Sequence, residues 1–516
     1  MNGIASLVQS LSSGYLTAQA LTVILLFALG LLFVTASWPL EAGSPLVDII
    51  WIPLLAFPAG LALFSTAGYL MLCLGIPFGL HTMITALSAI AVFGVVFLLK
   101  SYKIDYIKQR RIYAVMIVIS IAVATVCSVM STINIFDVVL DNDSFFYFST
   151  FPEAIVQEGA YIRYFDVFLT DAAPVGSIIQ TLPYLFGFSE TFGLQYVMNA
   201  DLILVLAFAL YTELSGTLGK KAGICCSAAA SLFLVTSSAY LTTAKWVMAG
   251  VYFMSYFFIT AFLGYRAASM TRKPCVLMAL FAVNLAMMRQ EGVVLTAILI
   301  LCLSFLPEYS GRELFFWFIC PVTAAAALYY IRVFLILGIE PLYAFLTPVK
   351  AVIMLLFLVS CGIYVLLVRD RLKPEAAALL PWGLPFMLLL LNAALAVVKP
   401  ADYLGNLKMF YLNVRIGAGW GYFGYICGAV FLLLVVKAVL NRERYLLFFD
   451  SLMISYVLGV LLVAFGRGDA LRKGVGDSGN RVMLTAVPVI VFSLVLRYFS
   501  CRKSEQNGGG EDAEKS

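Results

Sequence analysis

The chain alternates between long apolar runs and short polar breaks along almost its whole length. A helix that crosses a membrane needs roughly 20 predominantly apolar residues, so a chain of this length has room for about 13 to 15 such helices. In order, we expect them near residues 18–37, 47–74, 82–99, 113–135, 193–214, 222–240, 247–265, 276–288, 293–305, 314–335, 351–368, 377–398, 422–440, 446–465 and 482–495. The pattern therefore predicts an all-α polytopic membrane protein.

The composition supports this fold class. Hydrophobic residues make up 63% of the chain and charged residues 12%, whereas charged residues make up about a quarter of a soluble domain. The net charge of +5 would indicate an anionic partner in a soluble protein, but in a membrane protein most Lys and Arg lie in cytoplasmic loops. Membrane lipids are thus the expected surroundings, and no nucleic acid is implied.

The distribution of Lys and Arg predicts the orientation. If the expected spans alternate, six basic segments fall on one side, which the positive-inside rule assigns to the cytoplasm. These segments are residues 100–111, 219–221, 266–273, 369–373, 441–444 and 502–504. The prediction is a multi-pass protein of the inner (plasma) membrane, with the longest loop, residues 136–192, on the extracytoplasmic face.

That loop is both acidic and aromatic. Arg163 is its single Lys or Arg, so ion pairing inside the loop cannot balance its eight carboxylates. They are Asp137, Asp141, Asp143, Glu153, Glu158, Asp166, Asp171 and Glu190. Loops of this length are often functional. The alternation of Phe and Tyr with small apolar residues predicts interfacial helices along the membrane surface.

Asp141 and Asp143 follow directly after a predicted span, at the depth of a lipid headgroup. Transfer of a group to a hydroxyl needs a base, and a histidine or a carboxylate can serve. The only histidine, His81, falls near the third expected span. We therefore take Asp143, and next Asp141, as candidate catalytic bases, and we assign Tyr147 and Glu153 to substrate binding. The same DNDS segment could also cap a helix.

Basic residues on the extracytoplasmic side run against the positive-inside bias and suggest bound anions. The candidates are Lys245, Arg289, Arg415, Arg467, Arg472, Lys473 and Arg481. Guanidinium groups suit phosphate, and we assign Lys245, Arg289, Arg415 and Arg481, together with Glu291, to substrate binding. Arg289 and Glu291 lie between two very short apolar segments, which predicts a helical hairpin whose turn enters the membrane. An internal ion pair between Arg289 and Glu291 and a headgroup anchor at Arg481 are the structural alternatives.

Two further ionisable residues, Asp201 and Arg332, fall inside predicted spans. Charged side chains inside a membrane are costly and commonly functional. Pairing with each other or with the backbone is the alternative explanation.

Three segments resemble the GT-C superfamily of integral membrane glycosyltransferases: LDNDSFFYFSTFPEAIVQEG after a span, MRQEG in a turn, and GDSGNRVMLTAVPVIV at the last span. The resemblance covers roughly residues 113–498. It implies that an acidic residue of the first large outer loop is the catalytic base, which matches Asp143 and then Asp141. It also matches Arg289 and Glu291 to an R-x-E-G pattern and Arg481 to an arginine before the last span.

The resemblance implies an inverting transfer from a polyprenyl-phosphate sugar donor to a glycan, lipid or protein acceptor. It names no certain cofactor, and a divalent metal stays open because the superfamily includes enzymes with and without one. It divides the chain into three parts. Residues 1–111 are N-terminal spans additional to the family pattern, residues 112–500 are the catalytic module, and residues 501–516 form the C-terminal end. The last of these is polar and Gly-rich, so we expect a disordered cytoplasmic tail.

Other functions fit a many-span protein. A flippase or transporter of lipid-linked sugars would tend to show internal repeats, and the sequence shows none. An O-antigen-type polymerase or ligase would place its large loops nearer the C-terminal half, whereas the acidic loop here is early. A membrane scaffold would not need so many unbalanced loop carboxylates.

Overall fold

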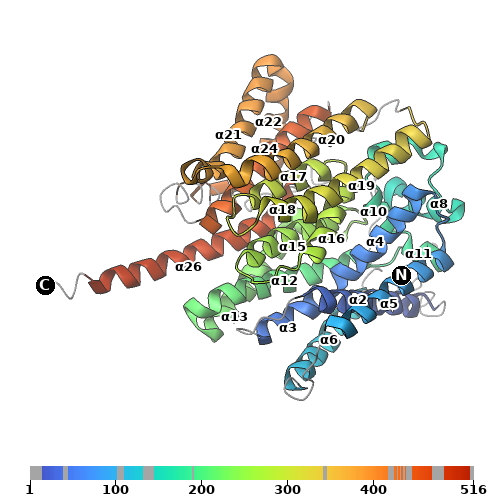
Figure 1. Cartoon of the computed structure of the whole chain (residues 1–516), viewed down its shortest axis with the longest axis horizontal. Coiled ribbons are helices and arrows are strands. Elements are labelled where there is room, and N and C mark those ends of the chain that lie inside the picture. The colour runs from blue at the N-terminus through green and yellow to red at the C-terminus, as the bar shows by residue number, and fades with distance from the viewer. Residues whose placement is uncertain are drawn as a thin grey trace. The chain divides into compact units, whose positions relative to one another are not determined.

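The computed structural model consists of helices, and the residues that it describes include no β-strand (Figure 1). Those residues are 14–38, 45–101, 110–131, 145–188, 191–340, 346–415, 424–426, 428–429, 432–433, 436, 444–467 and 482–511. The predicted all-α class is confirmed.

In this described part of the chain, nine helical segments are long and apolar enough to cross a membrane. They are Tyr15–Ser37, Ala56–Leu74, Ala114–Ser131, Leu194–Leu218, Gly311–Ile336, Pro348–Arg371, Leu379–Val398, Phe448–Phe465 and Val482–Phe499. The bent pair Lys220–Thr236 and Ala239–Lys245 would make a tenth. The protein is therefore a multi-pass membrane protein.

The count is lower than the 13 to 15 spans expected from the sequence. The expected spans outside the nine are residues 82–99, 222–240, 247–265, 276–288, 293–305 and 422–440. Two of them form α16 (Cys275–Met288) and α17 (Gly292–Leu303), with 14 and 12 residues. Both are apolar but too short to cross a membrane alone, and residues 422–440 lie largely outside the described residues.

The chain packs as two compact units. The first comprises residues 1–201, 244–304 and 308–371, and the second comprises residues 202–243, 305–307 and 372–516. Helix α12 (Leu194–Leu218) begins in the first unit and continues in the second. The predicted boundaries at residues 111 and 500 remain a prediction.

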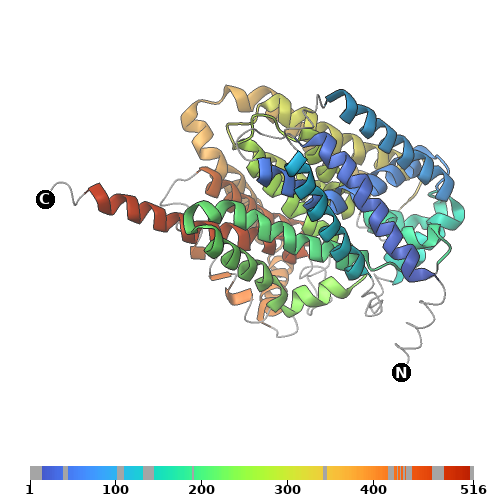
Figure 2. The same cartoon turned by 90° about the horizontal axis from the view of Figure 1, so that it is seen from below.

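The N-terminal helices of the first unit are α2 (Tyr15–Ser37), α3 (Pro45–Leu54), α4 (Ala56–Leu74), α5 (Leu80–Ser101) and α6 (Arg110–Ser131). The blue helices of Figures 1 and 2 pack side by side, with α2 against α4, α5 and α6. Gly30 of α2 and Gly60 of α4 lie at the crossing: a Cβ on Gly30 would overlap the carbonyl oxygen of Ala56, and one on Gly60 that of Leu26. Small residues thus allow the two backbones to touch, as is common between membrane helices.

The break between α3 and α4 falls at Leu55. Pro58 has no N–H to donate to Leu54, so the helical hydrogen-bond pattern is interrupted there. The single apolar run expected at residues 47–74 is consequently two helices.

The middle of the first unit holds α15 (Gly250–Ala268), α16 and α17. Helix α16 packs against α4, α15 and α19 (Cys320–Tyr330). The buried amide of Asn284 on α16 accepts from Ser65 Oγ at 2.5 Å and donates to Thr66 Oγ1 at 2.9 Å, both on α4. Because the surroundings are apolar, this pair of polar contacts fixes α16 on α4.

The acidic loop contributes a set of short helices: η2 (Phe146–Thr150), α8 (Phe151–Glu158), η3 (Arg163–Phe165), α9 (Asp166–Asp171), α10 (Pro174–Ile179) and α11 (Leu182–Leu185). Figure 1 shows α8, α10 and α11 near one end of α4. Every residue of α10 is buried, and α10 packs against α4 and α16. The expected surface helices are therefore present as helices, but α10 belongs to the interior because five of its six residues are apolar or glycine.

The rest of the first unit continues through α18 (Gly311–Leu314), η5 (Phe315–Ile319), α19, η6 (Ile331–Ile336), α20 (Pro348–Ile363), η7 (Tyr364–Val368) and η8 (Arg369–Arg371). Helix α20 leaves a row of apolar side chains exposed, including Val349, Val352, Leu356 and Ile363. Such a surface is unfavourable in water and suits contact with lipid tails.

The second unit contains α13 (Lys220–Leu232), η4 (Phe233–Thr236), α21 (Pro374–Val398), α22 (Pro400–Arg415), α24 (Arg444–Arg467) and α26 (Val487–Glu511). Short helix α14 (Ser238–Lys245) joins it to the first unit along the chain. Buried Asp450 of α24 and Arg497 of α26 form an ion pair. Helix α26 continues to Glu511, so residues 501–511 are helical where the sequence predicted a disordered tail.

Candidate functional site

Helices α16 and α17 form a short hairpin. At 1.5 Å per residue they are roughly 21 Å and 18 Å long, less than the roughly 30 Å of a hydrocarbon core. A Cβ on Gly292 would lie 2.6 Å from the carbonyl oxygens of both Leu285 and Ala286, so only glycine allows α17 to start so close to α16. If the base of this hairpin lies at one membrane surface, its tip ends inside the membrane, as the sequence predicted.

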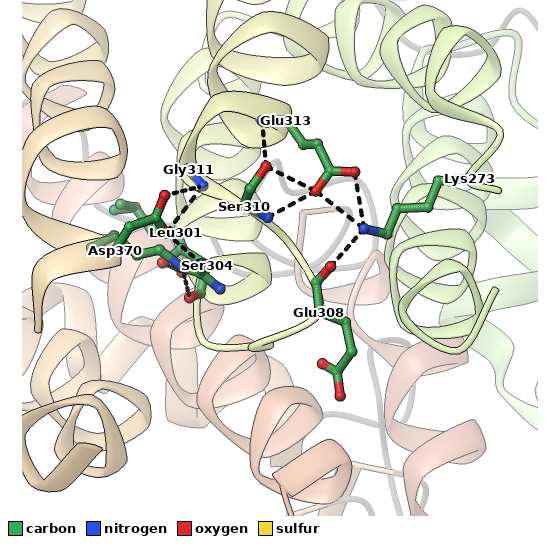
Figure 3. A network of polar contacts seen from close by, with 9 residues as sticks. Lys273, Leu301, Ser304, Glu308, Ser310, Gly311, Glu313 and Asp370 are labelled. Carbon is green, nitrogen blue, oxygen red and sulfur yellow. Dashed lines mark hydrogen bonds and ion pairs between the residues drawn. The ribbon is translucent and has the colours of Figure 1, made fainter. Parts of the chain in front are cut away.

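The base of the hairpin is closed by charged groups (Figure 3). Lys273, just before α16, donates to the carbonyl oxygen of Glu308 at 2.6 Å and to the two carboxylate oxygens of Glu313 at 3.0 and 3.1 Å. Glu313 also accepts from the backbone N–H of Ser310 at 2.8 Å. The chain entering α16 and the chain leaving α17 are thereby fixed to each other.

A second contact set adjoins this base. Asp370 accepts from the backbone N–H of Gly311 at 2.9 Å and from Arg369 at 2.6 Å (Figure 3). Arg369 also donates to the carbonyl oxygen of Ser304 at 3.1 Å. By the predicted orientation, all these connections lie on the cytoplasmic side, and the hairpin tip points toward the extracytoplasmic side.

The tip of the hairpin consists of Arg289, Gln290 and Glu291. Arg289 Nε donates to Glu291 Oε1 at 2.5 Å, and the two side chains are 15% and 11% exposed. The internal ion pair that the sequence left as an alternative is therefore present. Anion binding by Arg289 remains a prediction, and Gln290 between them is buried.

The acidic loop lies directly against this tip, and Gly176 of α10 is at the point of contact. A Cβ on Gly176 would lie 3.0 Å from the Phe148 ring of η2, 3.1 Å from Ala249 and 3.4 Å from the carbonyl oxygen of Met288. Met288 immediately precedes Arg289. Four segments that are separate in the sequence, namely η2, α10, the start of α15 and the hairpin tip, therefore meet at one glycine.

Hydrogen bonds order the loop around this point. Ser177 Oγ donates to the carbonyl oxygen of Tyr147 at 2.9 Å, which connects α10 to η2. Tyr147 OH lies 3.4 Å from Asp171 Oδ2, a long hydrogen bond to the end of α9. These contacts place predicted substrate-binding residue Tyr147 next to the segment that touches the hairpin tip.

A second hydroxyl pair lies in the same loop. Ser149 Oγ and Tyr184 OH are 3.0 Å apart. Burial raises the pKa of the Tyr184 hydroxyl, the hydrogen bond with Ser149 opposes this, and the negative charge of Glu153 adds to the increase. Glu153 itself is half-buried on α8 and accepts from Gln157 Nε2 at 3.1 Å.

The other predicted site residues are more scattered. Lys245 is exposed at the end of α14, four residues before Ala249. Arg415 is exposed at the end of α22, in the second unit. Asp141, Asp143 and Arg481 lie outside the described residues. The structure thus brings Tyr147, Arg289 and Glu291 into one region.

Asp201 and Arg332 do not pair with each other in the described part of the chain. Asp201 is buried in α12, and neither of its carboxylate oxygens has a hydrogen-bond partner among the residues described. The Arg332 guanidinium lies against Gly75, the left-handed residue that ends α4. A cation is favourable there because a helix C-terminus is partly negative.

Sequence analysis missed Gln290 and Gly176. Gln290 stands inside the RQEG segment that was singled out for its charges, and its burial is the signal that marks it. Gly176 follows Pro174 in an apolar stretch with no chemical group, so only its neighbours in space show its position.

Metal binding stays open. Within the described ranges, no three His, Cys, Asp or Glu side chains are placed to hold a metal ion together. The acidic segment at residues 137–143 is not among those ranges.

Comparisons with protein families, with curated proteins and with solved structures find no match for this chain.

Proposed function

We propose that the protein is a membrane glycosyltransferase that moves a sugar from a polyprenyl-phosphate donor to an acceptor on the extracytoplasmic face of the plasma membrane. The observation that supports this best is the contact at Gly176 between the acidic loop and the hairpin tip. That loop carries Asp141 and Asp143 in its sequence, and the tip carries Arg289 and Glu291. A carboxylate and a guanidinium near lipid headgroups are the groups that this transfer needs.

The proposed reaction is an inverting displacement. Asp143 accepts the proton of the acceptor hydroxyl, and the hydroxyl oxygen attacks the anomeric carbon of the donor sugar. The bond from that carbon to the phosphate oxygen breaks, and its electron pair leaves with the polyprenyl phosphate. Lys245, Arg289, Arg415 and Arg481 are the candidates to stabilise the phosphate charge.

The short hairpin suits an amphipathic donor. Its prenyl chain would remain among lipid tails, next to the apolar exposed surface of the bundle, while its sugar phosphate would lie at headgroup depth. With its base on the cytoplasmic side, the hairpin would point its tip toward the outer leaflet, where such a donor would lie.

The test is release of polyprenyl phosphate by the purified protein in proteoliposomes with polyprenyl-phosphate-linked glucose, galactose, mannose or arabinose. The assay contains a mixture of glycan and lipid acceptors. We expect release with at least one donor and a decrease of about 100-fold or more in Asp143→Asn, because loss of a general base costs this much. Asp141→Asn should have a smaller effect.

Glu158→Gln is the matched control, because Glu158 is an exposed carboxylate in the same loop. It should keep wild-type activity. Full activity in both Asp143→Asn and Asp141→Asn would exclude the proposed base. Transbilayer movement of labelled donor without release of polyprenyl phosphate would instead favour a flippase, and growth of a lipid-linked chain would favour a polymerase.

A further inference from the structure

The hairpin tip contains a buried hydrogen-bond donor that has no acceptor among the residues the structure describes. Gln290 is 6% exposed, and its Nε2 has no hydrogen-bond partner among the described residues. Buried amide groups are almost always paired, because an unpaired one loses its bonds to water without replacement. A donor held in this state between two charged residues points to an acceptor that arrives from outside the chain.

A second feature of the tip points the same way. Helix α17 begins at Gly292, and its N-cap residue Glu291 makes no side-chain capping bond. The first N–H groups of a helix have no intrahelical acceptor, and the helix dipole favours an electron-rich atom near them. The Gln290 amide, two residues before α17, therefore stands beside the positive end of this helix, where the Gly292 N–H itself donates to the carbonyl oxygen of Arg289 at 2.9 Å.

The charge of the tip decides between two kinds of ligand. Arg289 and Glu291 are paired at 2.5 Å and neutralise each other. A phosphate at this point would have to approach the Glu291 carboxylate, whereas a neutral polyhydroxyl ligand would not be repelled. Sugar hydroxyls can accept from an amide and donate to a carboxylate, which matches Gln290 and Glu291 together.

We infer that Gln290 donates a hydrogen bond to an oxygen of the donor sugar, and that the hairpin tip recognises the sugar and not the phosphate. This inference rests on the proposed function and refines it. Lys245, four residues before Ala249, is then the candidate to bind the phosphate, and Arg289 orients Glu291. Gln290 is a specificity-determining residue in this scheme.

The experiment measures binding, so that it does not depend on the acceptor. Polyprenyl-phosphate-linked glucose, galactose, mannose and arabinose, and bare polyprenyl phosphate, are titrated into purified protein in detergent by isothermal calorimetry. For wild type we expect one sugar lipid to bind more tightly than bare polyprenyl phosphate. Gln290→Leu should reduce that preference by about 10-fold, the effect of one hydrogen bond, and leave the affinity for bare polyprenyl phosphate unchanged.

Two further variants separate recognition from folding. Gln290→Glu keeps the shape of the side chain but removes the donor, so it should lose the preference as Gln290→Leu does. Gln180→Leu is the matched control: Gln180 is also buried, but its Nε2 already donates to Tyr252 OH at 3.2 Å. We expect it to keep the preference.

The outcomes distinguish the inference from the proposed function. Equal weakening of the sugar lipid and bare polyprenyl phosphate in Gln290→Leu would make the tip a phosphate site and overturn the inference alone. An unchanged preference in Gln290→Leu would also overturn it. A wild-type protein that binds none of the lipids would overturn the proposed function as well.

Discussion

The two ends of the α16–α17 hairpin differ in how their polar groups are paired. At the base, Lys273, Glu313, Arg369 and Asp370 all have ion-pair or hydrogen-bond partners within the first unit (Figure 3). At the tip, Arg289 and Glu291 pair with each other, but the Gln290 amide is buried without a partner among the described residues. Paired groups hold a structure together, whereas an unpaired buried donor is costly unless a ligand uses it. We therefore interpret the base as structural and propose the tip as the place where a ligand binds.

The largest effect should come from disturbing the tight turn between α16 and α17. In Gly292→Ala the new Cβ would lie 2.6 Å from two backbone carbonyl oxygens, so the hairpin must open. We expect a loss of about 3 kcal/mol of stability, typical of overpacking, together with loss of donor binding. Thermal unfolding in detergent measures the first and calorimetry the second.

The control for this prediction is Gly405→Ala, since a Cβ there would have no neighbour within 4 Å. It should be neutral or slightly stabilising in the helix interior. A Gly292→Ala protein as stable as wild type would show that the close start of α17 is not required.

The next effect concerns the ion pair at the tip. Arg289→Leu leaves the mostly buried Glu291 carboxylate without its guanidinium, so we expect a loss of about 2 kcal/mol of stability, below the value for a fully buried pair because water reaches both side chains. The double variant Arg289→Leu/Glu291→Leu should regain most of that stability but bind the donor at least about 10-fold more weakly, since both groups have been removed.

Melting temperatures and donor affinities of the three proteins would show whether the pair has a role beyond stability. Wild-type donor affinity in the double variant would reduce the Arg289–Glu291 pair to a structural contact.

The smallest effect should come from the base. In Lys273→Met the amino group no longer bridges Glu308 and Glu313, but Glu313 keeps its bond to the Ser310 backbone. With Glu313 35% exposed, water can replace part of the lost interaction, and we expect a loss of about 1 kcal/mol. Donor affinity should not change, because the base does not touch the ligand. A clear decrease in donor affinity at unchanged melting temperature would remove the contrast between the two ends.

The positions of the helices were largely predictable, because each apolar run has to form its backbone hydrogen bonds within one segment. The sequence also predicted the hairpin, from two short apolar segments on either side of Arg289 and Glu291. Span number was not predictable to the same degree, since α16 and α17 are as apolar as full spans and differ from them in length. The burial of α10 was not predictable, because small apolar residues suit a membrane surface and a helix interface equally well.

The site was predictable only in part. The charges of the RQEG segment drew attention to the tip, but the pairing of Lys273 with Glu313 joins residues 40 positions apart, and no local pattern encodes such a distance. Gly176 could not be identified without coordinates, because it matters only through the lack of a side chain at the point where Phe148, Ala249 and Met288 meet. A role for Gln290 could be inferred only from the structure, because it rests on the burial of the side chain and on an Nε2 without a partner among the described residues.

The most direct test of the account is a structure of the Asp143→Asn protein with the polyprenyl-phosphate sugar that binds best, determined by electron cryomicroscopy. We predict that the sugar ring lies at the α16–α17 tip, within hydrogen-bond distance of the Gln290 amide, with its phosphate on the side of Lys245. A sugar bound elsewhere, with no contact to the tip, would contradict the account.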